Sequence, residues 1–455
     1  MAADKSADRG LIRGLLLGLL AVGAGLFGYG IAVRPQNLYL IVGAALGLVV
    51  IAITFIEPVS GLYLFVGAMF TEALLMFGSV SAARLLGILV LGAWTARSLA
   101  SGRFEIIMPT QAWLAVMFVL WGFLSAMWAM DLERLVTALL LLVQLVALYI
   151  LVINLVSCVK TVQIILAIVT SVSLALALLT IARALSGDTI AGRVDLGRIS
   201  MGNINAQAAY LVPSATLLMV LFSHQTRSVR RWLLLLGLSV IALAILATSS
   251  RGAIIAVSVV LVLGIIIDRR LLQVTLPALL VAAAALLVLP HTLVERLEAM
   301  VTLSDRAAGR VDIWLVALRI IRSHPALGVG LDGFAAAFNS YLPETPGIIS
   351  DIGTGRASHN IFLNVQSELG VIGTALFLVL IGTTLRSGLL AVVNCRRAGL
   401  LHLEGLALTA WLSLVAMLLM GLFLDLQYWK LFWMLLALPE VMRRLSVEAL
   451  LETPA

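Results

Sequence analysis

The sequence predicts an all-α, polytopic integral membrane protein, and three observations carry this prediction. Of the 455 residues, 62% are hydrophobic and 12% are charged, whereas soluble domains are typically about half apolar and about a quarter charged. Apolar runs of about 20 residues recur from end to end, and each is long enough to cross a bilayer as a helix. The basic residues lie mostly between these runs, so much of the net charge of +7 reflects positive-inside bias.

The apolar runs define the candidate spans and their orientation. Lys5, Arg9 and Arg13 precede the first run and place the N-terminus in the cytoplasm. Some runs are short or closely paired, so we expect about 12–14 transmembrane helices, an even number that returns the C-terminus to the cytoplasm. The candidate spans are 14–33, 38–56, 59–77, 82–99, 110–130, 134–156, 161–182, 206–223, 232–248, 252–267, 271–289, 360–384, 403–423 and 426–440.

Two longer polar intervals divide the chain. We expect a transmembrane region over 1–289 with a smaller outer loop at 184–205, a large outer loop with short helices at 290–358, and C-terminal transmembrane helices with a cytoplasmic tail at 359–455. Both outer loops carry arginines. Long loops can be translocated whatever their charge, which is one explanation, and an anionic ligand held at the outer face is the other.

One segment of the large loop has helical character. Val311 to His324 places Ile313, Trp314 and Ile321 on one side, and Pro325 marks the end of the helix. An amphipathic helix with a tryptophan and flanking arginines can lie in the membrane interface. Packing on the top of the helix bundle is the other interpretation.

The strongest candidate for chemistry is His359, at the point where the large loop returns to an apolar helix. We expect Ser358 to cap that helix, which places the imidazole near a helix N-terminus. The partial positive charge there favours the neutral base, and the unpaired backbone N–H groups favour a nearby anion. These are the requirements of a general base beside a phosphorylated leaving group. A histidine considered alone is more often structural.

Arginines are the candidate partners of an anion. The planar guanidinium group suits bidentate phosphate contacts. Several arginines that converge on one pocket could hold a diphosphate and stabilise its charge as it leaves. Arg251 lies between two apolar runs, where a snorkelling arginine is the alternative interpretation. Besides Arg310, the candidate substrate-binding residues are Arg193, Arg198, Asn203, Arg251 and Asn360.

The sequence indicates neither a metal site nor a cofactor. The carboxylates of the large loop are scattered, without a close pair of the kind that holds a metal in many glycosyltransferases. The stretch from Gly328 to Gly333 matches the dinucleotide-binding pattern, but it follows a helix and a proline rather than a strand. We therefore interpret it as a turn.

Four motifs in the second half of the chain occur together. They are Ser249-Ser250-Arg251-Gly252, Gly309-Arg310-Val311-Asp312-Ile313-Trp314, Pro325-Ala326-Leu327-Gly328-Val329-Gly330, and His359-Asn360 followed after nine residues by Gly370 and then by Gly373. With these motifs the chain resembles the bacterial O-antigen ligase family, within the superfamily that includes O-antigen polymerases and some protein O-oligosaccharyltransferases. The motifs cover roughly Thr248 to Gly373.

The resemblance implies a GT-C-like glycosyltransferase in the bacterial inner membrane, with its active site facing the periplasm. It implies transfer of O-antigen polysaccharide from undecaprenyl diphosphate to a sugar hydroxyl of lipid A–core, with membrane lipids and no nucleic acid as further partners. By the same resemblance His359 is the base and Arg310 an essential loop arginine. Arg251 and Arg198 carry over as substrate-binding residues, and Arg193 competes with Arg198 for its role.

The chemistry of the residues agrees with this implication. A diphosphate is already a good leaving group, so one base and several arginines suffice without a metal, and attack from the opposite face predicts inversion. The alternatives are an O-antigen polymerase, another lipid-linked oligosaccharide transferase, a transporter of lipid-linked glycans, and a non-catalytic assembly protein. Only the transferases predict that His359→Ala and Arg310→Ala abolish transfer in a protein that still inserts and folds.

Overall fold

The computed structural model describes residues 38–70, 72, 76–77, 80–102, 105–187, 194, 196, 204–288, 309–348 and 353–452. The predicted span 14–33 and three predicted substrate-binding residues, Arg193, Arg198 and Asn203, lie outside these residues. The chain forms two compact units. One contains residues 1–68 and 75–106, and the other contains residues 69–74 and 107–455.

The smaller unit consists of short apolar helices and one hairpin. Its elements are α2 (Leu38–Ile56), α3 (Pro58–Ala68), β1 (Met76–Phe77), β2 (Val80–Ser81) and α4 (Ala82–Ala100). The strands pair antiparallel, and α3 packs against both α2 and α4. The sequence predicted a span over 59–77, but the helix ends at Ala68. Glu72 supplies a physical reason, because its carboxylate pairs with the Lys430 ammonium group within the larger unit.

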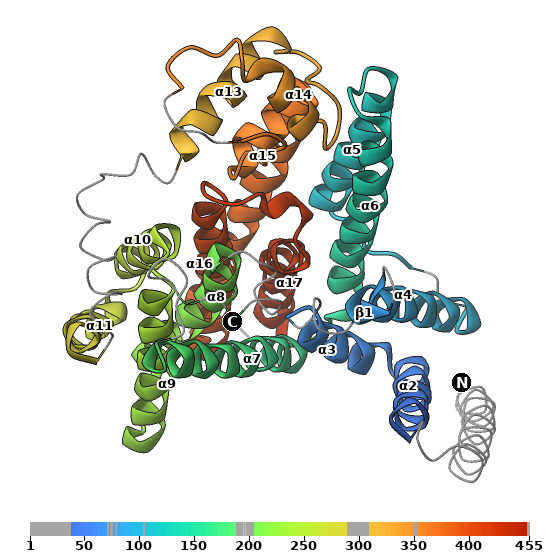
Figure 1. Cartoon of the computed structure of the whole chain (residues 1–455). Coiled ribbons are helices and arrows are strands. Elements are labelled where there is room, and N and C mark those ends of the chain that lie inside the picture. Colours follow the sequence, from blue (N-terminus) through green and yellow to red (C-terminus); the bar gives the residue numbers. More distant parts are fainter. Residues whose placement is uncertain are drawn as a thin grey trace. The chain divides into compact units, whose positions relative to one another are not determined.

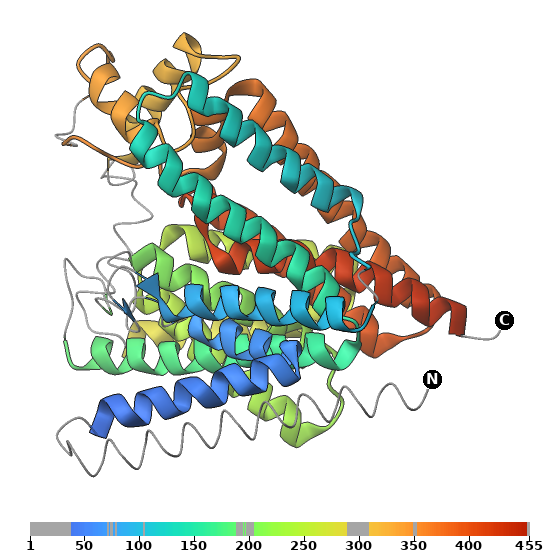
Figure 2. The same cartoon turned by 90° about the vertical axis from the view of Figure 1, so that its right-hand side faces the viewer.

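The larger unit holds most of the predicted spans. Its elements are α5 (Thr110–Leu124), η2 (Ser125–Met127), α6 (Leu132–Leu155), α7 (Val159–Leu185), α8 (Ile204–His224), α9 (Ser228–Ala247), α10 (Arg251–Ile267), η4 (Arg269–Leu271), α11 (Leu272–Val288), α13 (Arg310–Ser323), α14 (Phe334–Tyr341), α15 (Ile361–Arg397), α16 (Leu401–Met420), η5 (Leu426–Tyr428) and α17 (Lys430–Glu452). Figure 1 shows α13 and α14 gathered at the start of α15, and Figure 2 shows α5 and α6 side by side.

The helices have the lengths and surfaces of a polytopic membrane protein. In the described part of the chain, 8 helices are long and apolar enough to cross a membrane, and three shorter apolar helices accompany them. Large apolar side chains such as Trp113, Leu140 and Trp232 are exposed on α5, α6 and α9, which suits contact with lipid rather than water. The all-α, polytopic class is therefore confirmed, while the total of about 12–14 spans remains a prediction.

The central helix α15 is interrupted at Gly370, and the loop of residues 325–333 fills the interruption. Gly370 has φ 62° and ψ −164°, so the intrahelical hydrogen bonds stop there. Val329 N donates to the Ser367 carbonyl at 3.0 Å, Gly330 N to the Glu368 carbonyl at 2.9 Å, and Val371 N to the Pro325 carbonyl at 3.0 Å. The indole of Trp121 donates to the Leu369 carbonyl. The loop thus satisfies backbone groups that a break inside a span would leave unpaired.

The close approach of the 325–333 loop to neighbouring backbone explains why two of its positions are glycine. Gly328 has φ 71°, and a Cβ there would lie 2.3 Å from the Glu368 carbonyl oxygen. Gly330 has φ 95° and packs against Ala129. The stretch is a turn that lies against α15, as its position after a helix and a proline predicted.

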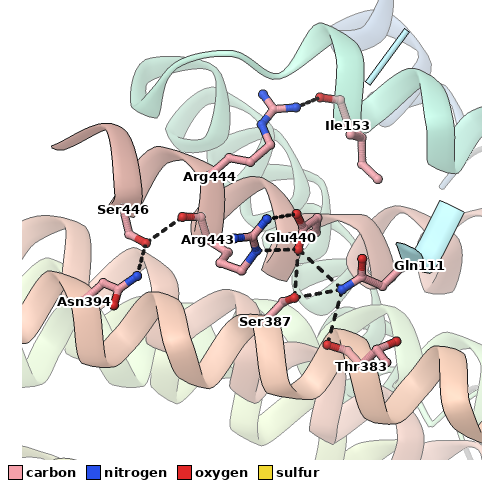
Figure 3. Close-up of polar contacts among 9 residues, drawn as sticks. All are labelled: Gln111, Ile153, Thr383, Ser387, Asn394, Glu440, Arg443, Arg444 and Ser446. Carbon is pink, nitrogen blue, oxygen red and sulfur yellow. Dashed lines mark hydrogen bonds and ion pairs between the residues drawn. The ribbon is translucent and has the colours of Figure 1, made fainter. Parts of the chain in front are cut away.

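A buried polar cluster joins α5, α15 and α17 near the C-terminal part of α15 (Figure 3). The Glu440 carboxylate accepts two hydrogen bonds from Arg443, at 2.9 and 2.7 Å. It also accepts from Ser387 Oγ at 2.8 Å and from Gln111 Nε2 at 3.4 Å. Glu440 is only 1% exposed, and such a carboxylate is tolerated because its partners surround it.

We expect Glu440→Leu to destabilise the protein by about 3 kcal/mol, because it leaves Arg443, Ser387 and Gln111 without their shared acceptor. Thermal unfolding of the purified protein in detergent measures the effect. Glu448→Leu on the exposed side of the same helix is the matched control and should unfold near the wild-type temperature. Equal unfolding temperatures for the two variants would contradict the role of the cluster.

Candidate active site

The site begins at the N-terminus of α15, where Asn360 rather than Ser358 caps the helix. Asn360 Oδ1 accepts from the backbone N–H groups of Phe362 at 3.0 Å and Leu363 at 3.1 Å. The prediction that Ser358 is the cap was therefore wrong. The physical reason is the backbone of His359, which has φ 50° in the left-handed region and moves the cap two residues along the chain.

Asp425 organises this turn from a distant part of the sequence. Its carboxylate accepts from Ser358 Oγ at 2.7 Å, from His359 N at 3.2 Å and from Asn360 N at 3.2 Å. The segment that carries it follows α16, and the Gly421 carbonyl accepts from Ile361 N at 2.7 Å. Asp425 thus stabilises the left-handed turn at His359 through three hydrogen bonds.

The His359 imidazole is oriented by the same carboxylate. Nδ1 lies 3.7 Å from Asp425 Oδ2, and about a third of the side chain, 32%, is exposed. Because Nδ1 faces Asp425, Nε2 is the ring nitrogen left for a substrate. Burial lowers the pKa of His359, the nearby Asp425 carboxylate opposes this, and the Arg310 and Arg356 guanidinium groups lower the pKa further. The net direction favours the neutral imidazole.

Arg310 reaches the site from the first turn of α13. Its N-cap, Gly309, has φ 77°, and the Arg310 guanidinium carbon lies 5.7 Å from the centre of the Phe423 ring. The Trp314 indole, one turn further on, donates to the Ser358 carbonyl at 3.1 Å. The helix is therefore tied to the residue that precedes His359, and it packs against α15.

Arg251 opens a helix that packs against Phe423. It is the first residue of α10, and a Cβ on its neighbour Gly252 would lie 2.7 Å from the Phe423 ring. Phe423 thus contacts both the start of α10 and Arg310. Ser250, the N-cap of α10, donates through Oγ to Asn205 Oδ1 at 3.0 Å. We call Arg251, Gly252, Arg310 and Phe423 the arginine wall.

The structure describes four of the seven predicted site residues and brings three of them together. His359, Asn360 and Arg310 meet at the start of α15, and Arg251 opens the helix whose Gly252 packs against Phe423. The Asn360 side-chain oxygen is used by the helix cap, and its role as a substrate-binding residue stays a prediction. Among the described residues, no group of three or more His, Cys, Asp or Glu side chains could hold a metal ion.

Two residues of the site were missed. Asp425 lies 66 residues from His359, and the only signal for it was an acidic residue between two apolar runs. Arg356 was one of several loop arginines, and nothing in the sequence distinguished it from the others.

A direct consequence concerns pH. If His359 acts as a base, activity requires the neutral imidazole and falls as pH drops through its pKa, which lies below the ordinary value of 6.5. We therefore expect the acidic limb of the kcat/KM profile to have its midpoint below 6.5. Asp425→Asn removes the carboxylate that raises this pKa, so the midpoint should move to a still lower pH. A midpoint above 6.5, or an upward shift in the variant, would contradict this assignment.

The fold and the site define a polytopic α-helical membrane protein with a histidine–aspartate pair beside an arginine wall. Residues 233–378 match the family model described as O-antigen ligase, and this match supports an assignment of the chain to the O-antigen ligase family. The match includes Arg251, Arg310 and His359, while Asp425 lies beyond it. It supports activity of the ligase and polymerase type. No curated protein matches the chain.

Proposed function

We propose that the protein is an O-antigen ligase that transfers a polysaccharide from undecaprenyl diphosphate to a sugar hydroxyl of lipid A–core. The observation that carries the proposal is the His359 imidazole, with Nδ1 3.7 Å from Asp425 Oδ2, in the field of the Arg310 guanidinium. A base and a fixed positive charge are the two requirements for transfer from a diphosphate-linked donor. The family match over residues 233–378 supports the same reaction class.

The reaction follows from these positions. His359 Nε2 takes the proton of the acceptor hydroxyl while its oxygen attacks the anomeric carbon of the donor. The bond from that carbon to the diphosphate oxygen breaks, and the diphosphate leaves with the electron pair. The arginine wall compensates the developing negative charge, and Asp425 stabilises the imidazolium that forms. Attack opposite the leaving group inverts the anomeric configuration.

The site is proposed to face the periplasm, with the chain in the inner membrane. The basic residues before the first predicted span and after the last support a cytoplasmic location of both termini. With an even number of spans, the start of α15 then lies on the opposite side. Polymer built on a lipid carrier and lipid A–core would meet at that face.

Transfer with purified components tests the proposal. The protein in nanodiscs is given lipid-linked polymer and rough lipopolysaccharide, with and without a chelator, and the product is followed by gel shift. We expect polymer on lipid A–core in both samples, because the proposed steps use only side chains. Absence of product from a folded protein contradicts the proposal, and loss of product with chelator contradicts its metal-independent form.

The polymerase is the competing assignment, because it uses the same donor with a lipid-linked acceptor. A deletion strain distinguishes the two. Loss of a ligase leaves bare core and polymer stranded on its carrier, whereas loss of a polymerase leaves core that carries a single repeat unit. We expect the first pattern.

A further inference from the structure

Arg356 lies on a short segment that is fixed at both ends. Gly355 N donates to Asn339 Oδ1 of α14 at 2.6 Å, and the Ser358 carbonyl accepts from the Trp314 indole at 3.1 Å. Residues 353–357 are exposed, and Ser358 is the first buried residue after them. The chain therefore holds Arg356 three residues before His359, on the solvent side of the turn.

The charge of Arg356 acts on the imidazole. Together with Arg310 it is one of two cationic side chains that lower the pKa of His359. The two arginines come from different elements, since Arg310 opens α13 and Arg356 lies in the loop that leads to α15. Two guanidinium groups held by different elements therefore both lower the pKa of His359.

Their surroundings differ in a way that suits two different substrates. Arg310 and Arg251 are half-buried. The Arg310 guanidinium lies over the Phe423 ring, and Gly252, the residue after Arg251, packs against the same ring. Arg356 is exposed and belongs to a segment tied to α14 instead. Inverting transfer places the leaving diphosphate and the attacking hydroxyl on opposite faces of the anomeric carbon, with the base beside the hydroxyl. The half-buried arginine wall suits the diphosphate, and the exposed arginine suits the acceptor glycan.

We propose that Arg356 binds an anionic group of the acceptor glycan, a phosphate or a carboxylate, close to the sugar that receives the polymer. A guanidinium group matches the geometry of either anion through paired N–H donors. The proposal rests on the proposed function, because it assumes a glycan acceptor. It adds that Arg356 recognises an anionic group next to the sugar that receives the polymer.

Steady-state kinetics in nanodiscs of neutral lipid test the proposal. We expect Arg356→Gln to raise the KM for a phosphorylated acceptor roughly 10- to 100-fold, the range for one lost hydrogen bond to a charged group. The KM for the donor should not change, and kcat should stay near the wild-type value when it is measured well above pH 6.5, where the imidazole is neutral in both proteins. Arg356→Lys should recover part of the loss, and Arg322→Gln, at an exposed position of α13, is the matched control with wild-type constants.

A second comparison uses an acceptor from which the phosphate has been removed, so that two proteins and two acceptors form a double-mutant-type cycle. If the anion is a phosphate, the wild-type protein loses the same factor with dephosphorylated acceptor, and Arg356→Gln loses nothing more. If the anion is a carboxylate, dephosphorylation leaves both proteins unchanged while the KM difference between them persists. Either result supports the proposal.

Three results overturn it, and each is distinct from failure of the proposed function. An unchanged acceptor KM in Arg356→Gln would show that Arg356 does not bind the acceptor. A raised donor KM assigns Arg356 to the diphosphate, and an effect that appears only in nanodiscs of anionic lipid assigns it to lipid headgroups. Failure of the wild-type protein to transfer polymer to any lipid A–core acceptor contradicts the proposed function itself.

Discussion

Replacing His359 by asparagine should reduce transfer by roughly 10²- to 10⁴-fold, the range attributed to a positioned general base. Asparagine is the informative substitution because His359 has φ 50°, and asparagine tolerates the left-handed region better than most residues. The variant therefore removes the base and keeps the turn that Asp425 holds. Initial rates with saturating donor and acceptor measure the loss.

The control for this variant is a histidine elsewhere in the protein. His402 is exposed on the first turn of α16, so His402→Asn should transfer at the wild-type rate. Unfolding temperatures confirm that both variants are folded. A wild-type rate for His359→Asn would show that His359 is not the general base, while the assignment as a polytopic membrane protein would still stand. A rate that recovers at high pH would instead indicate that hydroxide replaces the base.

The spacing of the last sequence motif has a structural explanation. Residues 361–369 form the half-helix between the Asn360 cap and the break at Gly370. Its length sets the separation between the imidazole at one end and the loop of residues 325–333 at the other. The nine residues between Asn360 and Gly370 in the motif are therefore the length of this half-helix. Gly373 is required by packing on the other side of the break, because a Cβ there would lie 3.1 Å from the Trp121 ring.

The spans were predictable because their signal is local. The length of an apolar run is set by the thickness of the bilayer, and α6, α8 and α16 begin and end within a few residues of the predicted limits. Three helices depart from the predicted limits: α15 and α17 extend well beyond them, and α3 ends early, at Ala68. An ion pair between Glu72 and Lys430 depends on how distant segments pack, and no window of sequence contains it.

The site was predictable only in part, for the same reason. His359 and Arg310 stand in short motifs, whereas Asp425 acts through three hydrogen bonds across 66 residues. The cap at Asn360 depends on the left-handed backbone of His359, and Ser358 was an equally suitable cap by residue type. Arg356 is distinguished from the other loop arginines by the anchors at Asn339 and Trp314. Each of these features is a tertiary contact.

Gly370→Ala should destabilise the protein by more than about 4 kcal/mol, a loss that only a few mechanisms produce. Gly370 has φ 62° and ψ −164°, a region that is open essentially to glycine alone. A Cβ there would lie 2.2 Å from the Ala326 carbonyl oxygen and 2.6 Å from Leu327 N. Both are backbone atoms, so no side chain can rotate away to make room.

Gly382→Ala is the matched control on the same helix. No atom lies within 4 Å of a Cβ at Gly382, and alanine is favoured over glycine inside a helix by about 1 kcal/mol. Its unfolding temperature in detergent should equal or exceed that of the wild type, whereas Gly370→Ala should unfold far lower or fail to accumulate. Because the displaced loop borders the half-helix that begins beside His359, any folded Gly370→Ala protein should also transfer slowly. Equal stability of the two variants would show that α15 does not break at Gly370.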